Sequence, residues 1–263
     1  EKSKPQADVF WNGEFVQTLV LKEKGLLEKY KPSGASGVPA EFVDSEGFWS
    51  GFGGRARVLL VNKNLMKPEE YPQSIMDLLD SKYKGETIGM AYPVFGTTAT
   101  HAAALYAVWG KDKARDFFKK LKEKNIQIVD GNSVVRDQVA EGRLSMGMTD
   151  TDDALEAVKK GKPVEIVFLD QKQDGMGTLV IPNTVALIKN GPNQKAGKKL
   201  VDFLMSAEAE AMLLEKGWID LPAHRENQKL ARNAGVKNLK TSFQEVFSEL
   251  EASKSDMQAL FVR

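Results

Sequence analysis

The stretch ETIGMAYPVFGTTATHAAALYAVWG, residues 86–110, contains a short apolar run, a Gly-Thr-Thr cluster and an alanine-rich segment. The apolar run before Pro93 predicts a buried strand, and the segment from Gly96 to Gly110 predicts a helix. The same order of strand and helix recurs along the chain. Such alternation is typical of an α/β protein with a largely parallel sheet that helices cover on both faces.

Two more junctions between a strand and a helix follow this stretch. IQIVDG (126–131) predicts a strand that leads into a short helix, for which Ser133 is a candidate N-cap, and LSMGMTD (144–150) predicts a strand before another helix. Because parallel strands end at one edge of a sheet, we expect the junction residues to lie together. The candidate site residues at these junctions are Gly96, Thr97, Thr98, Asn132, Ser133, Asp150, Asp152 and Asp153.

Each junction has two interpretations. Serine, threonine, asparagine and aspartate are common N-caps, and acidic residues in a first turn favour the helix dipole, so capping alone accounts for much of the composition. Alternatively, the backbone N–H groups and the hydroxyls of Thr97 and Thr98 form an anion site at the positive end of a helix. The two interpretations stay open for the sequence alone.

The glycine-rich segment GFGGRARVLLVN (51–62) is another candidate. Its glycines permit close approach of the backbone, and Arg55 and Arg57 point to the same face of a strand. One of these arginines could offer a bidentate fork to a carboxylate or phosphate, whereas the alternative is a solvated pair on a sheet face. Trp11 and Asn12 end the first predicted strand and are candidates at the same edge of the sheet.

The composition excludes several classes of protein. The 263 residues carry 37 basic and 36 acidic side chains, so the net charge of +1 gives no reason to expect a nucleic-acid partner. With no cysteine and only His101 and His224, the chain has no disulfide or thiolate site and little material for a hydrolytic triad. The sequence therefore contains the parts of a binding site, and we expect no enzyme.

Several segments together resemble, in order and spacing, the periplasmic ferric-ion-binding proteins of ABC importers, which are extracellular solute-binding proteins of family 1. The resemblance covers most of residues 7–225. It implies an α/β fold, the two-lobe periplasmic-binding-protein fold of type II, with hinged capture of a ligand in an interlobe cleft. The segments are ADVFW (7–11), GFGGRARVLLVN (51–62), SIMDLLDSKYKGETIGMAYPVFGTTATH (74–101), NSVVRDQVAEGRLSMGM (132–148), LVIPNTVALIKN (179–190) and KKLVDFLMSAEAEAML (198–213).

The resemblance also implies the organisation of the chain. We expect lobe 1 to comprise residues 1–54 and 183–225, lobe 2 to comprise residues 58–178, and residues 226–263 to form C-terminal helices. Asn183 ends one of the two crossings between the lobes and joins the candidate site. Family members open with a strand-helix-strand unit before the segment that matches ADVFW, so we expect lobe 1 to lack this first unit.

The family implies roles for particular residues. A helix start after the strand's proline holds a synergistic anion, which corresponds here to Gly96, Thr97 and Thr98, and a GRxRV motif places an arginine near that anion, which corresponds to Arg55. Where the iron binders carry adjacent tyrosines, this chain has Asp152 and Asp153.

The ligand prediction follows from the two aspartates that stand where the iron binders have tyrosines. Two carboxylates facing an anion pocket suit a zwitterion, with an ammonium at the aspartates and a phosphonate or phosphate at the anion pocket, as in 2-aminoethylphosphonate. The alternative is Fe(III) or another hard metal held by Asp150, Asp152 and Asp153 together with an anion. An alternative from another class is a metal-assisted phosphatase, and a third is a sensor that docks on a receptor.

The resemblance finally implies partners and location. We expect a monomer that delivers its ligand to an ABC permease in the inner membrane, with no cofactor except a metal ion bound as ligand. We expect the protein to be periplasmic, or extracellular and lipid-anchored.

Overall fold

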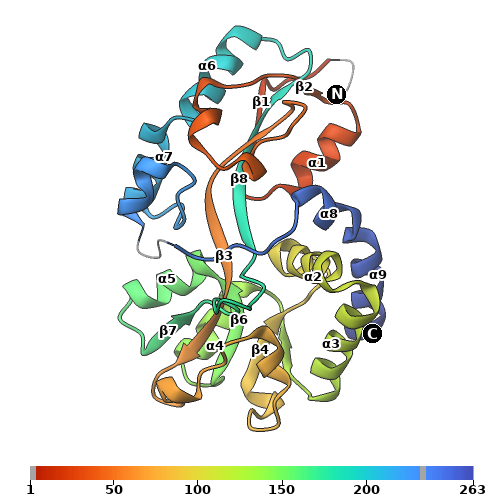
Figure 1. Ribbon diagram of the computed structural model, residues 1–263, viewed down its shortest axis with the longest axis vertical. Coiled ribbons are helices and arrows are strands. Elements are labelled where there is room, and N and C mark those ends of the chain that lie inside the picture. The colour runs from red at the N-terminus through yellow and green to blue at the C-terminus, as the bar shows by residue number, and fades with distance from the viewer. Residues whose placement is uncertain (1–3, 232–234, 263) are drawn as a thin grey trace. The chain divides into compact units, whose positions relative to one another are not determined.

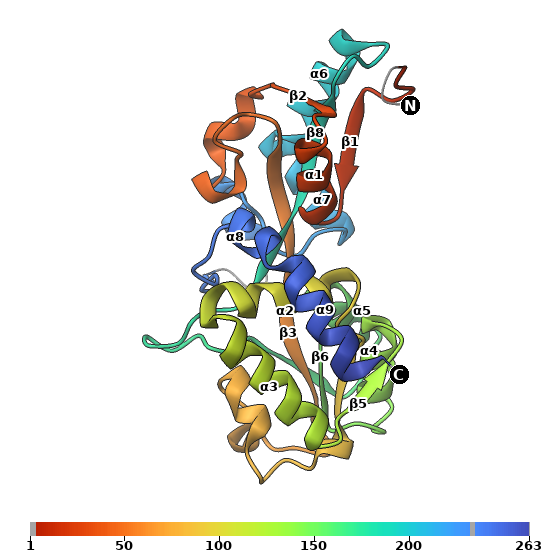
Figure 2. The same ribbon diagram turned by 90° about the vertical axis from the view of Figure 1, so that its right-hand side faces the viewer.

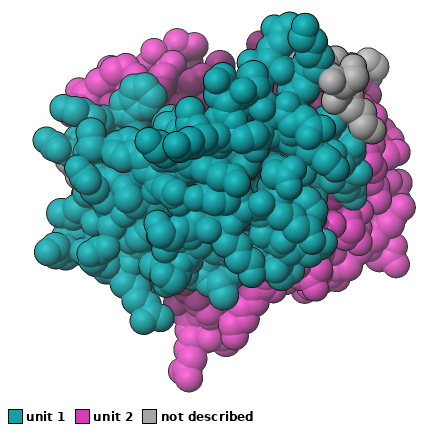
Figure 3. Space-filling view, turned by 90° about the horizontal axis from the view of Figure 1, so that it is seen from above, with its two compact units in different colours: residues 1–55, 181–235 teal, residues 56–180, 236–263 magenta. Residues whose placement is uncertain are grey.

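The chain passes three times between two units, after residues 55, 180 and 235. The computed structural model describes residues 4–231 and 235–262. Unit 1 comprises residues 1–55 and 181–235, and unit 2 comprises residues 56–180 and 236–263. Strands β3 (Ser50–Asn62) and β8 (Val180–Ile188) each have residues in both units (Figure 1). Each unit is therefore built from two stretches of chain that are far apart in sequence, as the colouring of Figure 3 shows.

The sheet of unit 2 has the strand order β7-β3-β6-β4-β5. Strand β4 is parallel to both β6 and β5, and each of these three strands leads directly into a helix. Strand β3 is antiparallel to β6 and β7, so the predicted parallel sheet holds only for the three strands with crossover helices. The bounds are β4 (Ile88–Ala91), β5 (Gln127–Val129), β6 (Met146–Asp150) and β7 (Val164–Val167).

Helices lie on both sides of this sheet (Figures 1 and 2). Helices α4 and α5 pack against each other and against β6, whereas α2, α3 and α9 pack together. The core between these layers includes Leu59, Met90, Leu105 and Phe117, and Met257 of α9 completes it. The bounds are α2 (Gly96–Trp109), α3 (Lys111–Glu123), α4 (Asn132–Ala140), α5 (Thr151–Lys159), α8 (Phe243–Ser248) and α9 (Leu250–Phe261).

Unit 1 contains a small antiparallel sheet. Strand β8 pairs with β1 (Val9–Asn12) and with β2 (Leu27–Glu28). Phe52 of β3 and Leu187 of β8 pack with the helix residues Val201, Leu204 and Met205 to form its core. The helices of this unit are α1 (Val16–Glu23), α6 (Gln194–Leu204) and α7 (Ala207–Lys216).

Two segments whose apolar residues have helical spacing, SIMDLLDSKYKGE (74–86) and the long stretch after Asn193, depart from one continuous helix each. The pattern SIMDLLDSKYKGE forms only a 3₁₀ turn, because Asp77 accepts hydrogen bonds from the N–H groups of Gln73 and Ser74 and the chain becomes extended at Asp80. The long helical pattern after Asn193 is two helices, because Ser206 caps α7. The 3₁₀ segments are Ser33–Gly37, Ala40–Phe42, Pro68–Glu70, Ile75–Leu79, Gly85–Thr87 and Arg225–Leu230.

A buried carboxylate, Glu210 on α7, organises the loop that follows this helix. It accepts hydrogen bonds from the backbone N–H groups of Gly53 (2.9 Å), Ala223 (2.8 Å) and His224 (3.0 Å), and from the side-chain amide of Asn227 (3.0 Å). Burial alone raises the pKa of Glu210, but hydrogen bonds from His224, Asn227 and the backbone outweigh it and hold the pKa below its usual value. His224 is buried, and its ring lies against this carboxylate.

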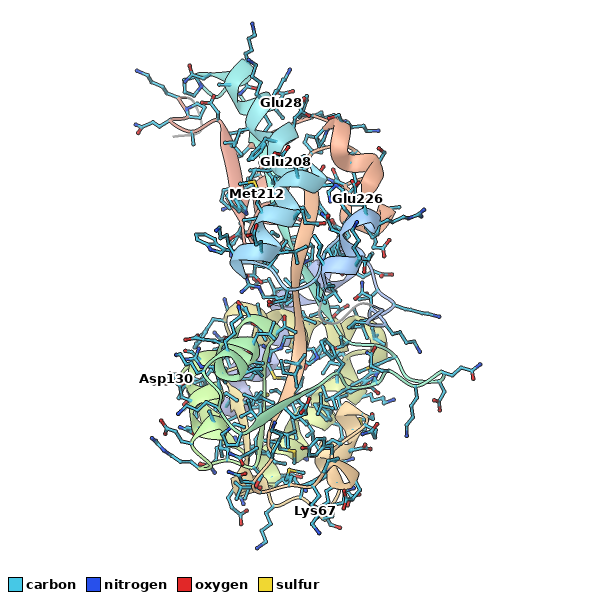
Figure 4. All side chains as sticks on the ribbon, turned by 90° about the vertical axis from the view of Figure 1, so that its left-hand side faces the viewer. Glu28, Lys67, Asp130, Glu208, Met212 and Glu226 are labelled. Atoms are coloured by element: carbon cyan, nitrogen blue, oxygen red, sulfur yellow. The ribbon has the colours of Figure 1, made fainter. Side chains whose placement is uncertain are left out.

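We expect Glu210→Gln to lower the free energy of unfolding by about 3 kcal/mol, because the amide leaves buried donors without an acceptor. Chemical denaturation measures this change. The control is Glu208→Gln on the same helix, since Glu208 is exposed (Figure 4) and its replacement changes stability by less than about 0.5 kcal/mol. Equal effects of the two substitutions would contradict the role of Glu210.

Candidate functional site

The candidate site of unit 2 is centred on an ion pair between β3 and β6. The strand register places Arg57 opposite Asp150, so that their side chains lie on one face of the sheet. Arg57 Nη1 lies 2.7 Å from Asp150 Oδ1, and the two residues are each 2% exposed. Burial removes most of the screening by water, so this pair is a strong local constraint.

Thr97 and Asn132 complete a closed network around the ion pair. Arg57 Nη1 also donates to Asn132 Oδ1 (3.1 Å) and Thr97 Oγ1 (3.3 Å). The Thr97 hydroxyl donates to Asp150 Oδ2 at 2.6 Å, and the Asn132 amide donates to Asp150 Oδ2 at 3.0 Å and to Thr97 Oγ1 at 2.9 Å. Thr98 donates to Asn132 Oδ1 (3.3 Å). The three predicted junctions are thus joined by their side chains.

The network adds two details to the prediction. The arginine that contacts Thr97 is Arg57, which the register of β3 places opposite Asp150, while the place of Arg55 near an anion stays a prediction. The Thr97 hydroxyl donates its single proton to Asp150, so it has no proton left for an external anion. Backbone N–H groups can supply donors for an anion in its place.

The starts of α2, α4 and α5 supply such donors. Their N-cap residues are Phe95, Gly131 and Asp150, and no side chain caps any of the three helices. Ser133, predicted as a cap, is an exposed residue of the first turn of α4. The first N–H groups of a helix have no partner within the helix, so the starts of α2 and α4 offer N–H donors at positive dipole ends. Side-chain capping does not account for these junctions, whereas Asp152 and Asp153 do lie in the first turn of α5, where acidic residues favour the helix dipole.

An acidic cluster lies at the start of α5. Carboxylate oxygens of Asp150, Asp152 and Asp153 lie within 4.8 Å of one another. Arg136 of α4 contacts Asp153 at 3.3 Å and also binds Glu156. Burial, followed by the negative charges of Asp152 and Asp150, raises the pKa of Asp153 to about 6. Oxygen donors at this spacing suit an ammonium group or a hard metal ion.

The remaining predicted site residues belong to unit 1. The ring of Trp11 lies 5.8 Å from that of Phe52, and the Trp11 side chain is 46% exposed. The Asn12 side chain bonds its own turn, accepting from Gly13 N–H and donating to Glu14 O. Asn183 is buried and donates to Gly53 O at 3.0 Å, so its amide holds the backbone of β3. Arg55 also lies in unit 1, beside Gly13.

Two residues of the site were not among the predicted ones. Arg57 carries the charge at the centre, and Arg136 binds the acidic cluster from α4. The alternation of β3 indicated that Arg55 and Arg57 are equivalent in direction, but only the register with β6 distinguishes them. Arg136 lies four residues after Asn132, hence on the same face of α4, which is the signal that could have revealed it.

A family model for bacterial extracellular solute-binding proteins matches residues 4–240. The chain belongs to this family. Members are the substrate-binding components of ABC importers, which hand small ligands to membrane permeases, and the chain has this role. This membership confirms the resemblance found in the sequence.

Individual relatives of this solute-binding protein differ in ligand. A Salmonella typhi protein provisionally named as 2-aminoethylphosphonate-binding and periplasmic is 26% identical over 97% of this chain and 76% of its own length. Iron-bound HitA from Pseudomonas aeruginosa superposes with a TM-score of 0.82 at 22% identity, over 97% of this chain and 83% of its own. AfuA from Actinobacillus pleuropneumoniae, with fructose-6-phosphate bound, gives a TM-score of 0.80 at 26% identity, over 99% and 84% of the two chains.

These structures confirm the predicted fold class, the two-lobe periplasmic-binding-protein fold. Among residues 4–231 and 235–262, no helix has the length and apolar character needed to cross a membrane.

We expect NMR titration of the Asp153 carboxyl to give a midpoint at about pH 6. Asp152→Asn lowers this midpoint because it removes a neighbouring negative charge, whereas Asp112→Asn on α3 leaves it unchanged. Since the raised pKa means that the native state holds this proton longer than the unfolded state, ionisation of Asp153 lowers stability as the pH rises from 3.8 to about 6. A midpoint near 3.8 in the native protein would contradict the buried cluster.

Proposed function

We propose that this solute-binding protein captures a phosphonate or phosphate that also carries an ammonium group, with 2-aminoethylphosphonate as the model ligand. The observation that carries the proposal is the set of uncapped helix starts of α2, α4 and α5 around a buried arginine, next to a pair of acidic side chains. A ligand with one anionic end and one cationic end matches both the helix starts and the acidic pair.

The anionic half of the ligand is bound by backbone N–H groups. The first turn of α2 begins at Gly96, and the first turn of α4 begins at Asn132. Hydrogen bonds join the Asn132 side chain to the hydroxyls of Thr97 and Thr98. Gly96 is exposed and has a φ of +58°, so a side chain there would be strained, and none shields these N–H groups. Helix starts of this kind bind phosphate groups through N–H donors and the dipole.

The cationic half is bound by the carboxylates of Asp152 and Asp153. Both side chains are partly accessible, whereas Asp150 is buried and bonded to Arg57. An ammonium near Asp153 favours the ionised carboxylate and lowers its pKa from about 6. Binding of an amine is therefore weaker below about pH 6 than above it, because protons and the ammonium compete for the same carboxylate.

The relatives support the class of ligand. The Salmonella typhi protein is provisionally named for 2-aminoethylphosphonate, and AfuA was solved with a sugar phosphate. HitA was solved with iron, and the three clustered aspartates favour a hard metal with a bound anion as the second candidate. The proposal includes a monomeric, lipid-anchored or free periplasmic protein that acts with an inner-membrane permease, binds no nucleic acid, needs no cofactor and catalyses no reaction.

We expect 2-aminoethylphosphonate to bind about tenfold or more tightly than ethylphosphonate, which lacks the amine, because a charge-assisted hydrogen bond contributes about 1.5–3 kcal/mol. Isothermal titration calorimetry at pH 7.5 measures both affinities. The double variant Asp152→Asn/Asp153→Asn removes the difference between the two ligands. The matched control Asp112→Asn/Asp116→Asn removes the same charge from exposed residues of α3 and keeps the difference.

Other outcomes would overturn this proposal. Stabilisation by Fe(III)-citrate alone, lost in the Asp152/Asp153 variant, would assign the site to a metal. Metal-dependent turnover of a generic phosphate ester, abolished by Asp150→Asn, would assign it to a phosphatase.

A further inference from the structure

Arg57 has one edge that its ion pair does not use. Nη1 donates to three side chains, those of Asp150, Asn132 and Thr97. Nε and Nη2 are buried and have no hydrogen-bond partner among the described residues. Because Nε and Nη2 carry three N–H groups, a buried guanidinium in this state needs an acceptor that the protein does not supply directly.

A small cavity lies beside Arg57, within unit 2. Its volume is about 20 Å³, which is room for one water molecule. Most of its walls are apolar, including Met148, but Arg57, His101, Thr178 and Asp170 are polar, and Asp170 Oδ2 already accepts from the Ile75 N–H group. A water molecule in a pocket of this size is stable only where such polar partners exist.

His101 of α2 lines the same cavity as Arg57. It follows Thr97 by four residues, so the two side chains lie on one face of the helix, one turn apart. Thr97 accepts from Nη1 of Arg57, and His101 lines the cavity together with Arg57. The helix therefore presents a hydroxyl and an imidazole to the same guanidinium.

We propose that the cavity holds one ordered water molecule that accepts from Nε or Nη2 of Arg57 and donates to the His101 ring, which makes His101 a positioning residue for Arg57. This inference does not depend on which ligand the protein binds. His101 contacts no ligand; it acts through the water and the arginine.

The protonation state of His101 agrees with this role. Burial of the imidazole and the positive charge of Arg57 lower the pKa of His101 to about 3. The ring is therefore neutral at physiological pH and always has one nitrogen that accepts a hydrogen bond. A protonated ring would instead repel the arginine.

The arrangement also defines how Arg57 acts on the site. An incoming anion cannot reach Nε and Nη2, because both atoms are buried. The arginine therefore holds Asp150, Thr97 and Asn132 in place through Nη1. Its positive charge acts on the site without direct contact with the anion. The water and His101 keep the guanidinium in that orientation.

The test uses the ligand-free chain. A high-resolution crystal structure is expected to show one water between Arg57 and His101, and NMR is expected to show a slowly exchanging Nε–H signal for Arg57. His101→Leu removes the acceptor and speeds exchange of this Nε–H about tenfold or more, whereas His101→Gln retains an acceptor and keeps exchange slow. The control Met148→Leu alters the apolar wall of the same cavity and leaves the exchange rate unchanged.

Three results would overturn the proposal. If the cavity shows no electron density for a water molecule, no bridge exists. An anomalous peak in the cavity after a bromide soak would show that it holds a halide ion and no water. Equal exchange rates in wild type, His101→Leu and His101→Gln would remove His101 from the positioning of Arg57. None of these measurements involves 2-aminoethylphosphonate, so a failed ligand assignment leaves them interpretable.

Discussion

The buried ion pair between Arg57 and Asp150 is the constraint on which the site of unit 2 depends. It joins β3 to β6, and its hydrogen bonds extend to the first residues of α2 and α4. Removing one member of such a pair typically costs about 3–5 kcal/mol, since the other charge is then buried alone. The relative positions of the starts of α2 and α4 therefore depend on one electrostatic contact.

Most helices of the described residues begin without a side-chain cap. Ser206 and Ser242 cap α7 and α8 with side-chain hydrogen bonds, whereas α1, α2, α3, α4, α5, α6 and α9 have no such cap. A missing cap leaves N–H groups unsatisfied at a cost of about 1 kcal/mol each helix. Because helices of both units lack a cap, the missing caps do not by themselves distinguish the starts of α2 and α4; what distinguishes these two starts is the network that joins them to Arg57.

The sequence was sufficient for those features that depend on local patterns. Each predicted junction is a strand followed directly by a helix, and parallel pairing then brings such junctions to one edge. The contribution of Arg57 was not predictable, because Arg55 and Arg57 face the same way and only the pairing of β3 with a strand some ninety residues later separates them. Burial of His224 was also unpredictable, since the loop that contains it reads as polar and depends on Glu210, fourteen residues earlier.

The discontinuous units have a consequence for how the protein is made. The core of unit 2 includes Met257, and the core of unit 1 needs both Phe52 and Met205. A ribosome that has synthesised the first hundred residues has completed neither core, so the emerging polypeptide gains its stability only late. The same interleaving means that no single cut in the chain would release an intact unit.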